Sequence, residues 1–171
     1  MVDGEGMPVP AIRLVGWSGS GKTVLGVKLV AELRSRGHRV GVLKHAVKHP
    51  APPDQSHKDT GRYADAGADV VAGAFEDAAV IRIPSDAATL EGLLAMMGTS
   101  VDLVIVEGYN DTPLPSVVVQ RDDMVARDTL GEVIAIVDGG AANGHFASDD
   151  VSSIADVIER WFSSRSIWSD S

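Results

Sequence analysis

Apolar residues occur along the chain both in short continuous runs and at helical intervals, and the two spacings predict different elements. Continuous runs bounded by glycine, charged or turn residues are typical of strands buried in a parallel sheet. Such runs predict strands at 11–15, 39–43, 102–108, 117–120 and 133–139. These runs are far too short to cross a bilayer, which requires about 20 apolar residues.

Helical spacing of apolar residues predicts helices between several of these strands. The helix over 23–36 is followed by Gly37, at the position where helices commonly end, and its apolar stripe consists of Val24, Val27, Leu29, Val30 and Leu33. A short helix is predicted over 60–68. A third helix is predicted after a cap at Ser85 or Asp86, with its inward residues at Leu90, Leu93, Leu94 and Met97. A fourth helix is predicted from Asp149, with its inward residues at Val151, Ile154, Val157, Ile158 and Trp161.

The order of these elements indicates an α/β fold with a mostly parallel sheet flanked by helices. The strand, helix and strand over 11–43 form a βαβ unit, whose crossover is right-handed in a parallel sheet. The runs 70–74 and 79–83 predict an inserted β-hairpin or two adjacent strands, and the proline-rich stretch 49–57 predicts a surface loop. We therefore expect a flexible N-terminus at 1–9, a single domain over 10–163 and a flexible C-terminus at 164–171.

The composition is that of a globular domain without disulfides or cysteine-bound metals. The chain has 171 residues, of which 44% are hydrophobic and 23% charged, and it contains no cysteine. Its first ten residues carry acids and no lysine or arginine, unlike a signal peptide, so we expect a cytoplasmic protein without a membrane partner. The net charge of −9 argues against a nucleic-acid partner, because phosphate contacts need a basic surface.

Positive charge is nevertheless concentrated in the stretch 34–62, which contains seven of the fifteen basic residues and four of the five histidines. Only Asp54 and Asp59 oppose this charge within the stretch. A local basic region on an acidic protein suits a compact anionic ligand such as a nucleotide, although a solvated helix end and loop would have the same composition.

The segment Gly16–Thr23, with the sequence GWSGSGKT, matches the phosphate-binding pattern G-x-x-x-x-G-K-[ST] at every fixed position. It follows a predicted strand and opens a predicted helix, which is the context that the pattern requires. Its glycines bring backbone N–H groups close to phosphate oxygens, and the helix dipole favours negative charge. The segment predicts a nucleoside triphosphate site formed by Gly16, Trp17, Ser18, Gly19, Ser20, Gly21, Lys22 and Thr23.

A P-loop of this kind binds Mg²⁺ together with a carboxylate from a neighbouring strand. Lys22 is expected to reach the β- and γ-phosphates, and Thr23 to offer its hydroxyl to Mg²⁺. Glu107 ends a buried apolar run, so it emerges at the sheet edge where ligands of α/β folds bind. Asp59 is a second candidate for the catalytic and metal-binding carboxylate, although it could equally cap a loop, and Glu107 could simply favour solubility.

The nucleotide base is left open by these residues, because the guanine-reading pattern [NT]-K-x-D is absent from the chain. Asp138 at the end of 133–139 could accept hydrogen bonds from guanine. An aspartate before Gly139 and Gly140 is, however, also typical of a turn.

Six segments are informative when taken together: GWSGSGKT, LKH, KHPAPPDQSHKDT, DAGA, VEGY and PLPSVVVQR. From about residue 12 to residue 121 they resemble the molybdopterin-guanine dinucleotide biosynthesis protein B family, MobB. The resemblance implies a P-loop NTPase fold in a GTP-binding, weakly GTP-hydrolysing accessory protein, a homodimer that acts with a guanylyltransferase to attach GMP to molybdopterin. It implies Mg²⁺ beside Asp59 and Glu107, and phosphate-bearing ligands, molybdopterin among them, beside Lys44, His45, His49, Lys58 and Arg62.

The sequence departs from the family pattern where His57 replaces a usual glycine, and where Asn110 and Ser116 replace lysines. These changes remove positive charge and backbone freedom near the expected site.

Two other functions fit part of the sequence. In a metallochaperone GTPase, His45, His49 and His57 would bind a transition metal, but no cysteine is present to assist them. An ATP-dependent small-molecule kinase or ligase similar to dethiobiotin synthetase would share the P-loop and the VEG strand end. Binding of GTP compared with ATP separates these hypotheses.

Overall fold

The computed structural model describes residues 7–46, 58–84, 87–120, 130–140 and 144–164, with side chains from residue 61 onward in the second of these ranges. The described residues form two compact units. The large unit comprises the chain up to His45 and from Leu94 onward, and the small unit comprises 46–93. The prediction of a single domain over 10–163 stays a prediction.

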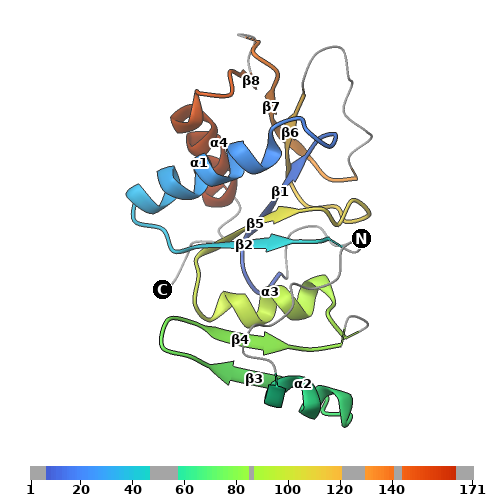
Figure 1. Cartoon of the computed structure of the whole chain (residues 1–171). Coiled ribbons are helices and arrows are strands. Elements are labelled where there is room, and N and C mark those ends of the chain that lie inside the picture. The colour runs from blue at the N-terminus through green and yellow to red at the C-terminus, as the bar shows by residue number, and fades with distance from the viewer. Residues whose placement is uncertain (1–6, 47–57, 85–86, 121–129, 141–143, 165–171) are drawn as a thin grey trace. The chain divides into compact units, whose positions relative to one another are not determined.

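The large unit is built on a parallel six-stranded sheet with the order β2-β5-β1-β6-β7-β8 (Figure 1). Each pair of neighbouring strands in it runs parallel, which confirms the predicted α/β fold. The short strand β8 has no signal in the apolar pattern. The strands are β1 (Ala11–Val15), β2 (Val40–Lys44), β5 (Leu103–Glu107), β6 (Ser116–Val119), β7 (Val133–Val137) and β8 (His145–Phe146).

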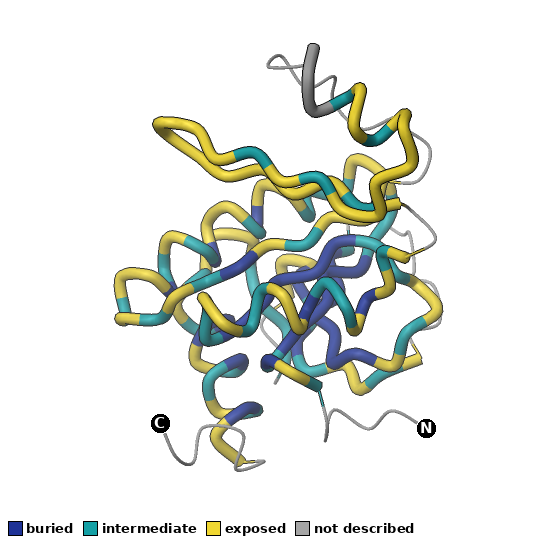
Figure 2. Tube along the Cα trace, turned by 90° about the horizontal axis from the view of Figure 1, so that it is seen from below, coloured by how far each residue is buried: buried dark blue, intermediate teal, exposed yellow. Residues whose placement is uncertain are grey.

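The helices α1 (Lys22–Ser35) and α4 (Val151–Ser163) pack against each other and against this sheet. Their inward side chains join those of the central strands in one core, which Figure 2 shows as the dark segments at the centre of the tube. The buried residues of the two helices are Leu25, Leu29, Leu33, Ile154, Ala155, Ile158 and Phe162.

The predicted stripe of α1 is partly wrong. Leu25 is buried, whereas Val24 and Val27 are 64% and 67% exposed. Residues four apart, such as Leu25 and Leu29, lie on one helix face, and each single step turns by about 100°. The face that the sheet covers therefore begins one residue later than the apolar spacing indicated.

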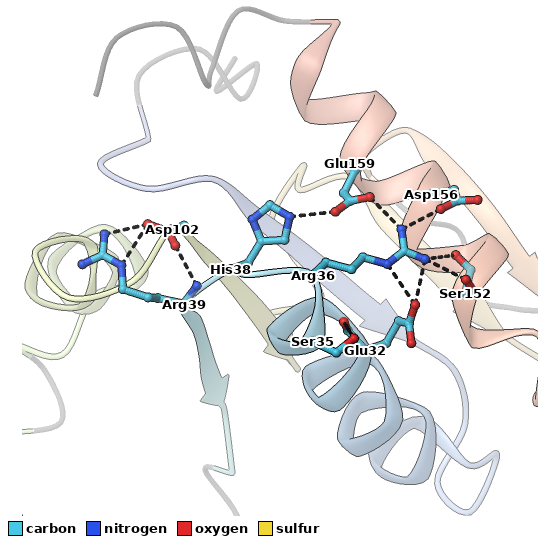
Figure 3. Close-up of polar contacts among 9 residues, drawn as sticks. All are labelled: Glu32, Ser35, Arg36, His38, Arg39, Asp102, Ser152, Asp156 and Glu159. Carbon is cyan, nitrogen blue, oxygen red and sulfur yellow. Dashed lines mark hydrogen bonds and ion pairs between the residues drawn. The ribbon is translucent and has the colours of Figure 1, made fainter.

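Polar contacts hold the end of α1 to α4 (Figure 3). Arg36, the residue directly after α1, donates to Asp156 at 2.6 Å and to Glu159 at 2.7 Å. It also pairs with Glu32 in the last turn of α1. His38 lies 2.7 Å from the other oxygen of Glu159. The loop after α1 is therefore attached to α4 by charge as well as by the apolar core.

The small unit contains α2 (Lys58–Asp65) and an antiparallel hairpin of β3 (Val71–Ala74) and β4 (Ala79–Arg82). The hairpin confirms the predicted insertion, and its turn is closed by the Phe75 N–H, which donates to Ala78 O at 2.7 Å. The helix predicted over 60–68 begins and ends earlier than expected.

The helix α3 (Leu90–Gly98) begins in the small unit, and its last turn from Leu94 belongs to the large unit. Its cap differs from the prediction: Thr89 Oγ1 accepts a hydrogen bond from the Gly92 N–H at 3.1 Å. The predicted caps Ser85 and Asp86 lie outside the described residues, as does the predicted loop 49–57. Within the described part of the chain, each helix is too short or too polar to span a membrane.

Candidate functional site

The P-loop Gly16–Thr23 joins β1 to α1, as the sequence pattern predicts. Gly19 and Gly21 have φ angles of +80° and +99°, in the left-handed region that side chains other than glycine rarely adopt. A Cβ at Gly16 would overlap the carbonyl oxygen of Val119 in β6. Glycine is therefore required at these three positions by the backbone itself.

The Lys22 ammonium lies over the loop rather than in solvent. Its Nζ donates to the carbonyl oxygens of Gly16 at 2.8 Å and Trp17 at 2.6 Å. Burial lowers the pKa of Lys22, the charge of Lys44 lowers it further, and Glu107 opposes both. An anion bound at the loop would stabilise the charged form of this lysine.

The Glu107 carboxylate lies at the carboxyl end of β5, between β1 and β2. Its Oε1 accepts a hydrogen bond from Thr23 Oγ1 at 2.8 Å, and its Oε2 pairs with Lys44 Nζ at 2.9 Å. Burial raises the pKa of Glu107, but the hydrogen bonds from Lys44 and Thr23 and the charges of Lys44 and Lys22 together lower it below 4.5. The carboxylate is thus held ionised beside the P-loop.

The spacing of Thr23 Oγ1 and Glu107 Oε1 fits a shared magnesium ion. Octahedral Mg²⁺ binds oxygen at about 2.0–2.1 Å, which places adjacent ligands about 3 Å apart. The observed separation is 2.8 Å. Among the described residues there is no group of three or more His, Asp or Glu that could hold a metal alone. A cation here would take its remaining ligands from phosphates and water, as Mg²⁺ usually does.

The turn after Glu107 folds back on β2. Gly108 has a φ of +92°, and a Cβ there would lie 2.8 Å from the Cβ of His45. The His45 ring stacks on Tyr109 with a centroid distance of 4.2 Å and an angle of 15° between the rings. The resemblance predicted that His45 lies beside phosphate-bearing ligands. In the structure its ring packs on Tyr109 next to Glu107.

The remaining predicted site residues belong to the small unit or lie outside the described residues. Lys58 and Asp59 form the first turn of α2, and Arg62 is exposed on the same helix. The side chains of Lys58 and Asp59, and the whole of His49, lie outside the described part of the chain. A shared role for Asp59 and Glu107 stays a prediction.

Asp138 forms a turn, which is one of the two roles considered for it. Its Oδ1 accepts a hydrogen bond from the Gly140 N–H at 2.8 Å, and its Oδ2 lies 2.8 Å from His145 Nδ1. The Gly140 N–H, followed by the His145 contact, lowers the pKa of Asp138. Both carboxylate oxygens are therefore engaged within the protein.

Sequence reasoning missed Arg13, which lies in the middle of β1 and is only 1% exposed. Its Nη1 donates to Tyr109 O at 2.9 Å, so it also supports the turn after Glu107. The available signal was a charged residue inside the apolar run AIRLV, since arginine is almost never fully buried unless it is paired.

A parallel sheet, a glycine loop at the start of α1 and a strand-end carboxylate beside the loop define an α/β protein of the P-loop class. Within that class, the family model described as "Molybdopterin guanine dinucleotide synthesis protein B" matches residues 11–139. The chain belongs to this family, MobB, as its sequence motifs indicated.

Curated relatives support the same assignment over most of the chain. The chain is 33% identical over 162 residues to the molybdopterin-guanine dinucleotide biosynthesis adapter protein of Haemophilus influenzae, covering 90% of this chain and 89% of the relative. It is 32% identical over 164 residues to the protein of that name in Escherichia coli, covering 90% and 93%.

Solved structures with this fold include one called molybdopterin-guanine biosynthesis protein B, with a TM-score of 0.65 and 25% identity. The match covers 90% of this chain and 99% of that one. A MobB homologue from Bacillus stearothermophilus has a TM-score of 0.64 at 23% identity, covering 91% and 99%, and it supports the fold alone.

Proposed function

We propose that this chain binds GTP with Mg²⁺ and serves as an adapter in the biosynthesis of molybdopterin guanine dinucleotide. The observation that carries the proposal is the contact of Thr23 with Glu107 beside the P-loop, in a chain that belongs to the MobB family. Phosphates would lie against the backbone of Gly16–Thr23, with Lys22 at the β- and γ-phosphates. The preference for GTP rests on the family, since Asp138 is engaged in a turn.

Thr23 and Glu107 would hold Mg²⁺, because their oxygens already lie at the spacing of adjacent ligands. When bound, the ion would neutralise charge that develops on the phosphates during hydrolysis. Lys44 keeps Glu107 ionised and oriented through its 2.9 Å ion pair. Among the described residues, Glu107 is the carboxylate at this site, and we expect slow hydrolysis that depends on it.

The adapter role implies protein partners as well as a nucleotide. The relatives in Haemophilus influenzae and Escherichia coli are named as adapters of molybdopterin-guanine dinucleotide biosynthesis. Because the motifs of the sequence resemble those of the MobB family, we propose a guanylyltransferase as the partner and a homodimer as the functional form. We propose a cytoplasmic location. His49 and His57, on which the metallochaperone hypothesis depends, lie outside the described residues. Among the residues that the structure describes, no observation favours a metallochaperone or a small-molecule kinase.

Calorimetric titration with GTP and with ATP, each with and without Mg²⁺, tests the nucleotide. We expect GTP to bind more tightly than ATP and Mg²⁺ to increase the affinity. Lys22→Ala should weaken GTP binding by about 10- to 150-fold, because a charge-assisted contact contributes roughly 1.5–3 kcal/mol.

The matched control is Lys28→Ala, which removes the same charge from an exposed position on α1. This variant should bind GTP like the parent. Equal affinities of the Lys22 and Lys28 variants for GTP would refute the phosphate site, and a preference for ATP would favour the kinase or ligase hypothesis.

A further inference from the structure

A cavity of about 610 Å³ lies against the face of β1 that is turned away from α1. Arg13 and Val15 line it, whereas Ile12 and Leu14 belong to the core with the leucines of α1, as the alternation of a strand requires. The volume is within the range of about 300–1,000 Å³ that is typical of small-molecule sites.

The cavity includes the first residues of the phosphate-binding loop but not its last ones. Of the described P-loop residues, Gly16, Trp17 and Ser18 line the cavity, and Lys22 and Thr23 do not. A molecule in the cavity would therefore touch the beginning of the loop, whereas the phosphates would lie at its end, next to α1. The two sites share Gly16, Trp17 and Ser18, whereas Lys22 and Thr23 belong to the phosphate site alone.

Arg13 places an incompletely satisfied cation at this cavity. Its Nη1 donates to Tyr109 O at 2.9 Å and its Nη2 to Ser116 Oγ at 3.4 Å, while its Nε has no partner among the described residues. Burial lowers the pKa of Arg13, and the charge of Asp111 opposes that effect. A buried cation is costly when its donors are unsatisfied, so an electron-rich group in the cavity would be stabilised.

The other lining side chains are a carboxylate, an amide and apolar groups. Asp111 and Asn110 are exposed at the mouth of the cavity, and Trp17, Val15 and Leu130 supply apolar surface. A carboxylate accepts hydrogen bonds from N–H groups, and an amide can donate to a carbonyl oxygen. An indole can stack on a flat ring.

We propose that this cavity binds the 2-amino-4-oxopyrimidine ring that guanine and pterins share. Asp111 accepts from the ring N–H and the amino group, and Asn110 donates to the ring carbonyl oxygen. The positive potential of Arg13 favours the same oxygen, and Trp17 packs on the ring face. This inference rests on the proposed function, because both halves of a molybdopterin guanine dinucleotide carry this ring edge.

The test titrates the full chain with guanosine and with 6-hydroxymethylpterin, neither of which carries a phosphate. Adenosine, which lacks the 2-amino-4-oxo edge, is the ligand control. We expect one or both of the first two to bind at least tenfold more tightly than adenosine. Asp111→Asn should abolish this preference, whereas Asp149→Asn, at an exposed carboxylate before α4, should retain it.

Further measurements distinguish a pterin from a nucleotide base as the source of the ring, and distinguish failure of the ring site from failure of the phosphate site. Binding of 6-hydroxymethylpterin to the protein saturated with GTP assigns the cavity to a pterin, and competition between guanosine and GTP assigns it to the nucleotide base. Lys22→Ala should lose pyrophosphate binding and keep ring binding, so failure of the phosphate site would be seen independently. Equal binding of adenosine, an unchanged preference in Asp111→Asn, or no binding of either ring would overturn the inference.

Discussion

The substitution Glu107→Gln separates the role of this residue in hydrolysis from its role in the fold. It preserves the size of the side chain and an oxygen that can accept the hydrogen bond from Thr23, now 2.8 Å long. It removes the negative charge, and with it the ion pair to Lys44. It also replaces the carboxylate that we propose as a ligand of Mg²⁺ by a weaker amide oxygen.

The expected effect of this substitution on stability is small. The Lys44 side chain is 59% exposed, and an ion pair so open to solvent contributes at most about 1 kcal/mol. Because the Glu107 side chain is only 12% exposed, removal of its charge also relieves part of a desolvation cost. The free energy of unfolding should therefore change by no more than about 1 kcal/mol, or about 2–4 °C in Tm.

The expected effect on turnover is larger. In the proposed function Gly16–Thr23 binds the phosphates in either variant, so the affinity for GTP should change only a few-fold. The charge at the metal matters more in the transition state, where negative charge develops, so turnover should fall by at least about tenfold, or about 1.4 kcal/mol in the barrier. Phosphate release at saturating GTP and Mg²⁺ measures this, once slow turnover by the parent has been established.

Asp102 offers the matched control, since it immediately precedes β5, whereas Glu107 ends it. Its carboxylate pairs with Arg39 at 2.6 Å, so Asp102→Asn also breaks a carboxylate contact beside this strand. That variant should hydrolyse GTP at the rate of the parent. If Glu107→Gln is as fast as the parent, Glu107 is not the catalytic carboxylate, and Asp59 becomes the residue to substitute.

Two predictions concern the contacts between α1 and α4. Arg36→Met keeps most of the aliphatic stem but loses the contacts with Asp156 and Glu159. The Tm should therefore fall by about 2–4 °C, which corresponds to a loss of about 1 kcal/mol after solvent screening. An equal Tm for variant and parent at low salt would contradict this. Burial raises the pKa of Glu159, but hydrogen bonds from His38 and Arg36 hold it below 4.5, so its stabilising contribution is present above that value and is lost as the pH falls through the lower pKa of the folded state. Urea unfolding measures the free energy of unfolding at about pH 5 and at about pH 3. Between these two values the free energy should decrease less for Glu159→Gln than for the parent, and equal decreases would rule out this linkage.

The loop of the candidate site could be predicted from the sequence because its geometry is local. The loop needs glycine where φ is positive, as at Gly19 and Gly21, and it needs Lys22 and Thr23 at the start of the helix that follows. Glu107 was also predictable, since a strand that ends in a carboxylate delivers it to the ligand-binding edge of a parallel sheet. Each of these assignments depends on neighbouring residues and on general rules of α/β folds.

Other features depend on which distant segments pack together. The apolar spacing of α1 predicted Val24 on the inward face, whereas the position of the sheet buries Leu25 instead. Lys44 pairs with Glu107 because β2 lies beside β5 in the sheet. The cavity at Arg13 is lined by residues that are as distant in the sequence as Leu130. The physical reason is that spacing along a chain specifies which way a side chain turns within its own element, whereas its burial, its partners and its pKa are set by atoms that only the folded chain brings close.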